Sequence, residues 1–412
     1  MNILYLHQYF ATPESNGGTR SFEMAKRFVS NGHNVTFITS SAFLSEDYCL
    51  SSGWNEIDIE GIKLNVLHLP YSNNDSYFKR SLKFVQFSLR AIPKSLKFKS
   101  DVILATSTPL TIAIPGIICS KINKIPMVFE VRDLWPELPV AVGAIKNKVL
   151  IWLAENLESY AYHNATRLIG LSPGMCDGIK RKGIASDKIT LATNSCDTDL
   201  FDVDESVGAT YKKEMISFVG DRKLVVYTGT FGPINDVSYI VSLAKASLNQ
   251  SSNVCFVAIG SGMQKDLVLE LAKSEEVLNN NLFILDPVPK TEIVKLLSAA
   301  DLSLSLFGPV EEMWHNSANK LFDALASGTP IAINYGGWQK DLIEKHECGL
   351  VLHEKDFSQA ALTINKFLND EKAYVSAKFS CKDLAYNYYS RDIMAKRLED
   401  ALLEAVNNEK TV

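Results

Sequence analysis

The chain has 412 residues, of which 46% are hydrophobic and 22% are charged, a balance typical of a globular protein with an ample core. Its formal net charge of −5 argues against binding polyanions along the whole chain. Its seven cysteines include no CxxC pair, which argues against a zinc site and favours a reducing cytoplasm over a disulfide framework. The N-terminal MNILYLHQYF lacks the features of a signal peptide, and the most apolar run, 110–119, is too short to span a bilayer.

Short β-rich apolar runs alternate with amphipathic helical patterns along the chain. We expect strands at 3–6, 35–39, 64–69, 102–105, 127–131, 168–171 and 189–192, and then at 224–228, 254–259, 282–285, 302–306, 330–334 and 349–352. Helical patterns lie between them, as at 20–31, 237–248, 290–300 and 320–327. This alternation predicts parallel sheets covered by helices on both faces, and there are too many strands for one such sheet.

We therefore predict an α/β protein of two Rossmann-like, doubly wound domains that face a cleft. The polar, turn-rich segment 194–205 suggests a boundary, which gives domains at 1–198 and 199–387. The C-terminal helix, 388–412, is compatible with either domain, and packing back on the first is one arrangement. Because such domains bind ligands at the carboxyl ends of their strands, the residues that follow each strand are the candidate site residues.

The first strand is followed by His7 and then by the pair Gly17-Gly18. His7 is either a cleft residue or a histidine satisfied within the core. Glycines before a helix let a ligand approach the backbone closely, although a plain flexible loop is the alternative. The pair is not a GxGxxG dinucleotide motif.

Residues 76–100 are basic and aromatic and contain no acid. Apolar residues such as Leu82, Val85 and Leu89 follow helical spacing within this segment. In an acidic protein, this pattern favours binding to an anionic membrane surface. The alternative is a helix that packs its apolar stripe on the sheet. The predicted membrane-binding residues are Lys79, Arg80, Lys83, Arg90, Lys94, Lys97 and Lys99.

The strand at 127–131 ends in a dense group of charges within FEVRDLWPELP. Glu130, Arg132 and Asp133 would be costly to bury there without a function. A catalytic carboxylate or a polar substrate pocket is one interpretation. An Arg132–Asp133 pair that closes the strand is the other.

Two glycine pairs follow the first two strands of the second half. Gly229-Thr230-Phe231-Gly232 comes after the strand at 224–228, and Gly260-Ser261-Gly262 follows the next strand. The second pair lacks the third glycine of a GxGxxG motif, which argues against NAD. No HExxH, GxSxG or Walker A pattern occurs in the chain, so no metal site is predicted.

The stretch NSANKLFDALASGTPIAIN, 316–334, starts a helix with small and polar residues. Asn316 or Ser317 is a suitable N-cap, and the amides of a helix start bind phosphate. Lys320 adds a positive charge, and Asp323 could bind the two hydroxyls of a ribose. The set suits a nucleoside diphosphate, and a capped surface helix is the alternative. The predicted phosphate-binding residues are Asn316, Ser317, Ala318, Asn319 and Lys320.

The order of these motifs resembles a known family. NGHNVTFIT, RDLWPE, NSCD, GSG, ADLSLSLF and FDALASGTP are similar to the retaining glycosyltransferases of family 4, which have the GT-B fold. The resemblance runs from Met1 to about Tyr389. The RDLWPE and NSANKLFD variants resemble a branch that builds bacterial O-antigen and capsule and includes N-acetyl-L-fucosamine transferases.

The resemblance assigns roles to residues, with departures. The family usually has two glutamates eight residues apart, and His315 and Asp323 stand at these positions. It implies that Asp323 binds the donor ribose, whereas His315 suggests an altered donor sugar. The family's Arg and Lys after the first strand of the second domain are absent from GTFGPIND, so the helix start and Lys320 would hold the diphosphate. Asp133 is the first catalytic candidate, and Arg132, His7 and Glu130 are the other candidates.

The resemblance implies retaining transfer of a sugar from a nucleotide diphosphate sugar, UDP-linked by expectation, without a metal or other cofactor. An N-acetylated deoxyhexose is one candidate sugar. The implied acceptor is a polyprenyl-diphosphate-linked saccharide at the inner face of the cytoplasmic membrane, and no nucleic acid partner is implied. A nucleotide-sugar epimerase of the same fold and a degenerate carbohydrate-binding regulator are the alternatives. The sequence leaves the base, linkage and oligomeric state open.

Overall fold

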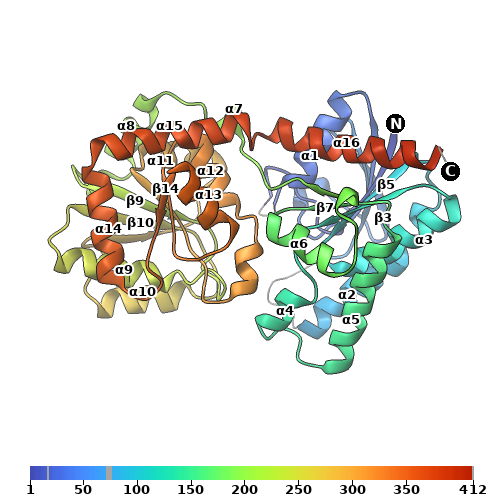
Figure 1. Ribbon diagram of the computed structural model, residues 1–412, viewed down its shortest axis with the longest axis horizontal. Coiled ribbons are helices and arrows are strands. Elements are labelled where there is room, and N and C mark those ends of the chain that lie inside the picture. The colour runs from blue at the N-terminus through green and yellow to red at the C-terminus, as the bar shows by residue number, and fades with distance from the viewer. Residues whose placement is uncertain (16–17, 71–76, 411–412) are drawn as a thin grey trace. The chain divides into compact units, whose positions relative to one another are not determined.

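The computed structural model describes the chain except for residues 16–17, 71–76 and 411–412 (Figure 1). It consists of two compact domains, Met1–Thr193 with Arg391–Val412, and Asn194–Ser390. Each domain is built on one mainly parallel sheet with helices on its faces, which confirms the predicted α/β class. The first domain ends at Thr193, a few residues before the predicted boundary at 198, and the C-terminal helix belongs to it.

The first domain has an eight-stranded sheet in the order β3-β4-β2-β1-β5-β6-β7-β8. All neighbours are parallel except β3 and β4, which form an antiparallel hairpin. The strands are β1 (Asn2–Leu6), β2 (Asn34–Ser40), β3 (Trp54–Ile59), β4 (Ile62–Leu67), β5 (Val102–Ser107), β6 (Met127–Val131), β7 (Arg167–Gly170) and β8 (Ile189–Leu191). Strand β3 was not among the predicted strands, because its residues alternate polar and apolar on a half-exposed edge.

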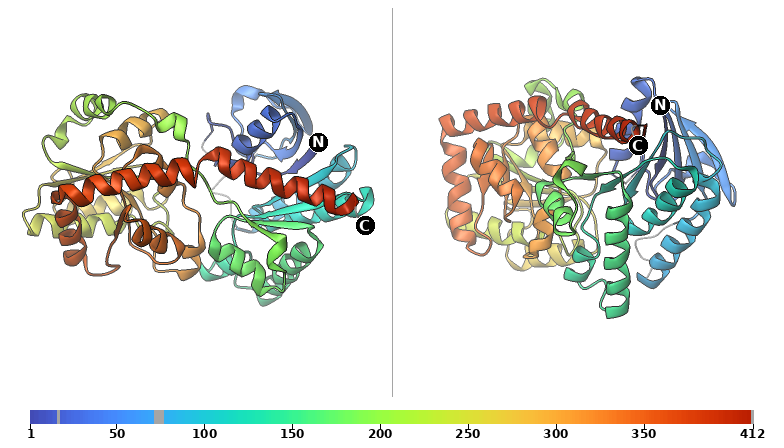
Figure 2. Two further views of the ribbon diagram at one scale, coloured as in Figure 1. Left: turned by 45° about the horizontal axis from the view of Figure 1, so that its top comes forward. Right: turned by 45° about the vertical axis from the view of Figure 1, so that its right-hand side comes forward.

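Helices cover both faces of this sheet. They are α1 (Arg20–Ser30), α2 (Tyr77–Ser95), α3 (Ala113–Asn123), α4 (Glu137–Ala141), α5 (Lys148–Asn164), α6 (Pro173–Arg181) and α16 (Arg391–Lys410). Helix α16 packs on α1 and on strands β5 to β8, as Figures 1 and 2 show. A short contact between His33 Nε2 and Glu399 Oε1, 2.7 Å, helps to hold it there. Every residue of β5 and β6 is buried, as expected for parallel strands covered on both faces.

The second domain has a six-stranded, fully parallel sheet in the order β11-β10-β9-β12-β13-β14. The strands are β9 (Lys223–Thr228), β10 (Val254–Ile259), β11 (Leu282–Leu285), β12 (Leu302–Ser305), β13 (Ile331–Ile333) and β14 (Gly349–Val351). The helices are α7 (Thr198–Phe201), α8 (Glu205–Glu214), α9 (Ser238–Asn249), α10 (Lys265–Ser274), α11 (Lys290–Ala299), α12 (Asn319–Ser327), α13 (Trp338–His346), α14 (Phe357–Asn369) and α15 (Glu371–Asn387). A buried apolar cluster between β9, β10, β12 and α9 forms its core.

Strand order tells where each sheet can bind a ligand. In the first domain the order reverses between β1 and β5, and in the second between β9 and β12. Ligands of doubly wound sheets bind beside the carboxyl ends of the strands at such reversals. The candidate residues His7, Gly229 and Asn316–Lys320 all follow strands at these two places. No helix within the described residues is long and apolar enough to cross a membrane.

Candidate functional site

Polar residues gather at the carboxyl ends of β1 and β6 in the first domain. His7 is buried, and its Nδ1 lies 2.9 Å from the Ser21 Oγ of α1. Burial, with the positive charge of Arg132 nearby, holds the pKa of His7 well below its usual value, so the ring is neutral at neutral pH. His7 is therefore a hydrogen-bonded buried histidine that also lies within electrostatic range of Arg132.

Gly18, just before α1, lies beside the same arginine. A Cβ built on Gly18 would stand 3.7 Å from Arg132 Nη2, an ordinary van der Waals distance. Gly17, the other predicted glycine, lies outside the described residues. The Arg132 backbone amide donates to the Ser107 Oγ at the end of β5, at 2.9 Å, which ties the ends of β5 and β6 together.

Asp133 follows Arg132 and is partly buried. Burial raises the pKa of its carboxyl group to about 6, although the positive charge of Arg132 lowers it in part. The carboxylate is thus ionised at neutral pH and takes up a proton in mild acid. A carboxylate with this pKa can stabilise developing positive charge or accept a proton at neutral pH.

Glu130 has a structural position, unlike the catalytic one predicted for it. Its side chain is fully buried, and its Oε1 lies 2.9 Å from the guanidinium of Arg20, while Thr106 donates to its Oε2 at 2.8 Å. Arg20 also donates to the carbonyl oxygens of Ala192, at 2.9 Å, and Thr193. The pair links α1, β6 and the end of the first domain, and both carboxylate oxygens are already bonded.

Two glycine loops of the second domain pack backbone against backbone. A Cβ on Gly260 would lie 1.8 Å from the Gly229 carbonyl oxygen, and one on Gly262 would lie 2.5 Å from the Phe231 carbonyl oxygen. The amides of Gly229 and Phe231 donate to Ile259 and Ser261 at 2.9 Å each. Only glycine permits this approach, so the loops after β9 and β10 form one rigid shelf. The Thr230 carbonyl accepts from the Tyr227 hydroxyl at 2.8 Å, and Gly232 lies further along the same loop.

Lys320 reaches this shelf from α12. A Cβ on Gly229 would lie 2.7 Å from Lys320 Cε and 3.0 Å from its Nζ, and that Nζ stands 5.2 Å from the centre of the Tyr227 ring. Burial lowers the pKa of Lys320 to about 8, and the charge of Asp323 opposes that shift. The ammonium is thus charged at neutral pH in a position where water solvates it poorly. An anion beside Gly229 would gain a strong interaction with it.

The N-cap of helix α12 lies one or two residues later than predicted, although the helix itself, Asn319–Ser327, nearly matches the predicted 320–327. Its N-cap is Ala318, neither Asn316 nor Ser317, and no side chain caps the first-turn amides. The methyl side chain of Ala318 cannot accept from those amides, although its carbonyl oxygen accepts from the Leu321 amide at 3.1 Å. The amides of Asn319 and Lys320 are therefore the ones that a ligand could use.

The residues before this helix hold the turn in place instead. The Asn194 amide donates to Ser317 Oγ at 3.0 Å, and its side-chain Nδ2 donates to the Ser317 carbonyl at 2.6 Å. Trp338 and Gln339 both donate to the Asn316 carbonyl at 2.8 Å. Asn194 was not among the predicted site residues. Its place in the NSCD motif, at the start of the second domain, was the available signal.

Asp323 forms an ion pair that the sequence did not predict. Its Oδ2 accepts a short hydrogen bond from Nζ of Lys290, which lies 4.9 Å from the Phe201 ring centre. Within the described part of the chain, Oδ1 has no such partner. A ribose could therefore use Oδ1, with Lys290 fixing the carboxylate. His315 ends the 3-10 turn Glu311–His315 and is partly exposed.

The apolar stripe of the basic helix α2 faces solvent. Leu82, Val85 and Leu89 are exposed, while Phe87 and Ala91 on the opposite side are buried. This arrangement contradicts the alternative in which the stripe packs on the sheet. Lys79, Arg90, Lys97 and Lys99 are exposed, and Arg80 and Lys83 are partly exposed.

Lys94, one of the predicted membrane-binding residues, has partners within its own domain. Its Nζ pairs with Glu56 at 2.8 Å and lies within 6 Å of the ring centres of Trp54 (5.7 Å) and Phe98 (5.8 Å). Its side chain is only 14% exposed.

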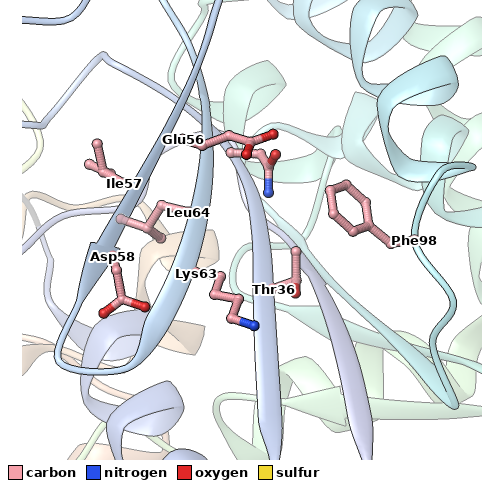
Figure 3. A pocket seen from close by; sticks show the side chains of 8 residues that line it. Thr36, Glu56, Ile57, Asp58, Lys63, Leu64 and Phe98 are labelled. Carbon is pink, nitrogen blue, oxygen red and sulfur yellow. The ribbon is translucent and has the colours of Figure 1, made fainter.

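A cavity of about 300 Å³ lies elsewhere in the first domain (Figure 3). Figure 3 shows Glu56 and Asp58 on one strand of the β3–β4 hairpin, Lys63 and Leu64 on the other, and Phe98 facing them. The remaining lining residues are Thr36, Ile57 and Asn65. None of these belongs to the predicted donor or catalytic sets. Among the described residues, no group of three or more His, Cys, Asp or Glu side chains is placed to hold a metal ion.

Comparisons with known proteins give a family for this architecture. Residues 17–195 match the model of the "Glycosyl transferase 4-like domain", and residues 211–382 match that of "Glycosyl transferases group 1". An uncharacterized glycosyltransferase of Methanocaldococcus jannaschii is 22% identical over 211 residues, which are 51% of this chain and 52% of the relative. The chain thus matches about half the length of that curated relative.

Solved structures share the fold across nearly the whole chain. HepE of Anabaena, solved in complex with UDP, has a TM-score of 0.71 and 17% identity, with 98% of this chain and all of that chain covered. WaaG, a glycosyltransferase involved in lipopolysaccharide biosynthesis, has a TM-score of 0.65 and 14% identity, with 97% and 98% covered. From the two family models, one on each domain, and this shared fold, the chain belongs to the glycosyltransferases of the GT-B type, with a family-4-like first domain.

Proposed function

We propose that this glycosyltransferase takes a sugar from a UDP-linked donor and transfers it, with retention of anomeric configuration, to a polyprenyl-diphosphate-linked saccharide. The proposed setting is bacterial surface polysaccharide synthesis, of O-antigen or capsule, at the inner face of the cytoplasmic membrane. The observation that carries the donor part is the position of Lys320, whose ammonium lies against Gly229 at the uncapped start of α12.

A diphosphate fits this position chemically. Its negative charge would meet Lys320, the amides of the first turn of α12 and the positive end of the helix dipole. As the bond to the sugar breaks, charge grows on the leaving diphosphate, and these groups are already oriented to stabilise it. We propose that they do so without a metal ion. UDP in the structure of HepE, a protein of the same fold, supports UDP as the first nucleotide to test.

The ribose and sugar parts of the donor have candidate partners in the same domain. Asp323 would accept hydrogen bonds from ribose hydroxyls through Oδ1, while Lys290 fixes the carboxylate through Oδ2. His315, at the end of its 3-10 turn, would contact the donor sugar. Because this histidine replaces an acid usual in the family, we propose a donor sugar outside the common hexoses, such as an N-acetylated deoxyhexose.

The proposals for catalysis and for the acceptor are supported by residues of the first domain. Asp133, ionised at neutral pH, would stabilise the positive charge that develops on the transferring sugar, with Arg132 and His7 beside it. The exposed apolar stripe and cations of α2 support an acceptor that lies in an anionic membrane. WaaG, which shares the fold, is also involved in lipopolysaccharide biosynthesis.

Calorimetric titration with UDP, GDP and ADP, each with and without excess EDTA, tests the donor site. We expect one nucleoside diphosphate to bind best and its affinity to be unchanged by EDTA. If none binds to the folded protein, or if binding needs a divalent ion, the proposed donor site is wrong. Product analysis of a nucleotide sugar incubated without acceptor then separates a transferase from an epimerase, which would convert the donor alone.

A further inference from the structure

Large apolar side chains are exposed together at the start of α5, a feature that the sequence analysis did not detect. Val149, Leu150, Trp152 and Leu153 are 64%, 56%, 60% and 50% exposed. The helix is properly formed there, because the Asn147 side chain caps the amides of Val149 and Leu150 at 2.9 and 3.2 Å. Single exposed apolar residues are ordinary, but a contiguous group of this size indicates an interaction surface.

This group has apolar neighbours on the same part of the first domain. Val140 and Val142, at the end of α4, are also exposed. Helices α2 and α5 both pack on α3 and on the 3-10 turn Leu110–Ile112, and Figures 1 and 2 show them at the same end of the domain. The exposed stripe of α2 and the start of α5 can therefore meet one extended partner.

The charges around this surface favour an anionic membrane over a second copy of the chain as the partner. Lys146 and Lys148 are exposed beside the apolar group of α5, and residues 138–154 contain no acid. Segment 79–99 of α2 and the turn after it likewise contains no acid. A second copy of the chain would bring like charges together across a symmetric interface, which is unfavourable. An anionic membrane offers an apolar interior next to negative headgroups and so matches both features.

We propose that the start of α5 is a membrane-insertion element, in which Leu150, Trp152 and Leu153 enter the boundary between lipid headgroups and acyl chains. The cations of α2 bind the headgroups beside it. The inference rests on the proposed function for the presence of a membrane, and it adds the element that makes binding resistant to salt. Tryptophan suits this role, because its ring is apolar and its N–H can bond at the headgroup level.

The fluorescence of Trp152 can be used to test the proposed insertion. Vesicles of anionic lipid brominated on the acyl chains should quench part of the tryptophan emission of the full-length protein, because bromine quenches on close approach. Trp152→Phe should remove most of that quenching, whereas Trp54→Phe, on strand β3, should keep it. Equal quenching in the wild type and in Trp152→Phe would overturn the proposal.

Affinity gives an independent readout. The double variant Leu150→Ser/Leu153→Ser should bind anionic vesicles at least about tenfold more weakly and lose the binding that persists in high salt. Its matched control is Met263→Ser/Leu267→Ser in the second domain, which should bind like the wild type. Met263 lies just before α10 and Leu267 on it, and they are 84% and 57% exposed. UDP titration checks that both variants are folded.

The outcomes separate this inference from the proposed function. One outcome would refute insertion and leave the proposal of a membrane-bound transferase intact. In it, the α5 variants bind vesicles as well as the wild type, whereas Lys79→Ser/Arg90→Ser abolishes binding. Failure of the wild type to bind anionic vesicles would refute both the insertion and the membrane part of the function. A lipid-free dimer that Leu150→Ser/Leu153→Ser dissociates would show a protein interface and also overturn the proposal.

Discussion

Lys320 is the residue on which the donor site depends most. Lys320→Met removes the ammonium beside Gly229 and should weaken UDP binding by about 1.5–3 kcal/mol, the range for a charge-assisted hydrogen bond. The matched control is Lys340→Met on α13, where the lysine is 43% exposed and pairs with Glu344. Calorimetry on both variants checks the prediction. Equal losses, or none, would mean that the diphosphate binds elsewhere.

The pKa of Lys320 adds a pH dependence to the same prediction. Its pKa of about 8 in the free protein should rise when a diphosphate binds, because the anion favours the charged form. Affinity should therefore be fully present well below pH 8 and fall as the pH rises above it. In Lys320→Met this fall should be absent.

Asp133 should control turnover more than donor binding. Asp133→Asn removes a charge needed at the reacting sugar, so kcat should fall by at least about 10²-fold while UDP affinity changes little. Because the pKa of Asp133 is raised to about 6, wild-type kcat should decline as the pH falls through that value. In Asp133→Asn this decline of kcat at low pH should be absent. A wild-type kcat that stays constant down to pH 5 would assign the role to another group.

Glu130 should matter for stability. Glu130→Ala leaves the buried guanidinium of Arg20 unpaired and should cost about 3–5 kcal/mol of unfolding free energy in the first domain. Glu60→Ala, which breaks an exposed pair with Lys26, should cost about 1 kcal/mol or less. Urea unfolding followed by circular dichroism compares the two. Normal stability with lost turnover in Glu130→Ala would restore the catalytic assignment.

Glu130 and Asp323 also show why single residues were hard to assign from sequence. FEVRDLWPELP indicates that charges gather at a strand end. Both faces of β6 are covered, however, so Glu130 is buried within the strand, whereas Asp133 lies beyond its end. Its partner Arg20 is distant in sequence, as Lys290 is from Asp323. Neither pair has a local pattern, so only the folded chain reveals them.

The glycine loops after β9 and β10 act as one element, and a matched pair of glycines tests their role. A methyl group on Gly229 would push into Lys320, 2.7 Å from its Cε, at a φ of +141° that favours glycine. Gly229→Ala should therefore weaken UDP binding by about tenfold or more. On Gly232 the nearest atom would be Asn235 Oδ1, at 3.3 Å, so Gly232→Ala should bind UDP almost normally. Thermal unfolding of both variants separates lost binding from lost folding.

The helices and strands themselves were largely predictable from the sequence, because apolar periodicity marks buried faces directly. Edge strand β3 was missed because half-exposed residues dilute that signal. The N-cap of α12 was predicted too early, because Asn316 and Ser317 are good caps by residue type. In the structure their backbone groups are instead held by Asn194, Trp338 and Gln339.

For the whole molecule, alternating strands and helices were enough to predict two doubly wound domains, since that pattern has few folded solutions. The surface was harder to predict. Helical spacing in α2 identified an apolar stripe, but sequence cannot tell whether such a stripe faces the sheet or the solvent. At α5 the apolar run 149–154 has the composition of a buried helix start, although most of its side chains are exposed.

The most direct test of the proposed function is transfer of labelled sugar into lipid. The purified protein is incubated in EDTA with radiolabelled UDP-sugars and polyprenyl-diphosphate-linked saccharides in anionic vesicles, and the organic phase is counted. We predict label in the lipid fraction with retained anomeric configuration, much reduced in Asp133→Asn and in Lys320→Met. Label that moves only to a soluble acceptor, or an interconverted UDP-sugar without any transfer, would contradict the proposal of a lipid-directed retaining glycosyltransferase.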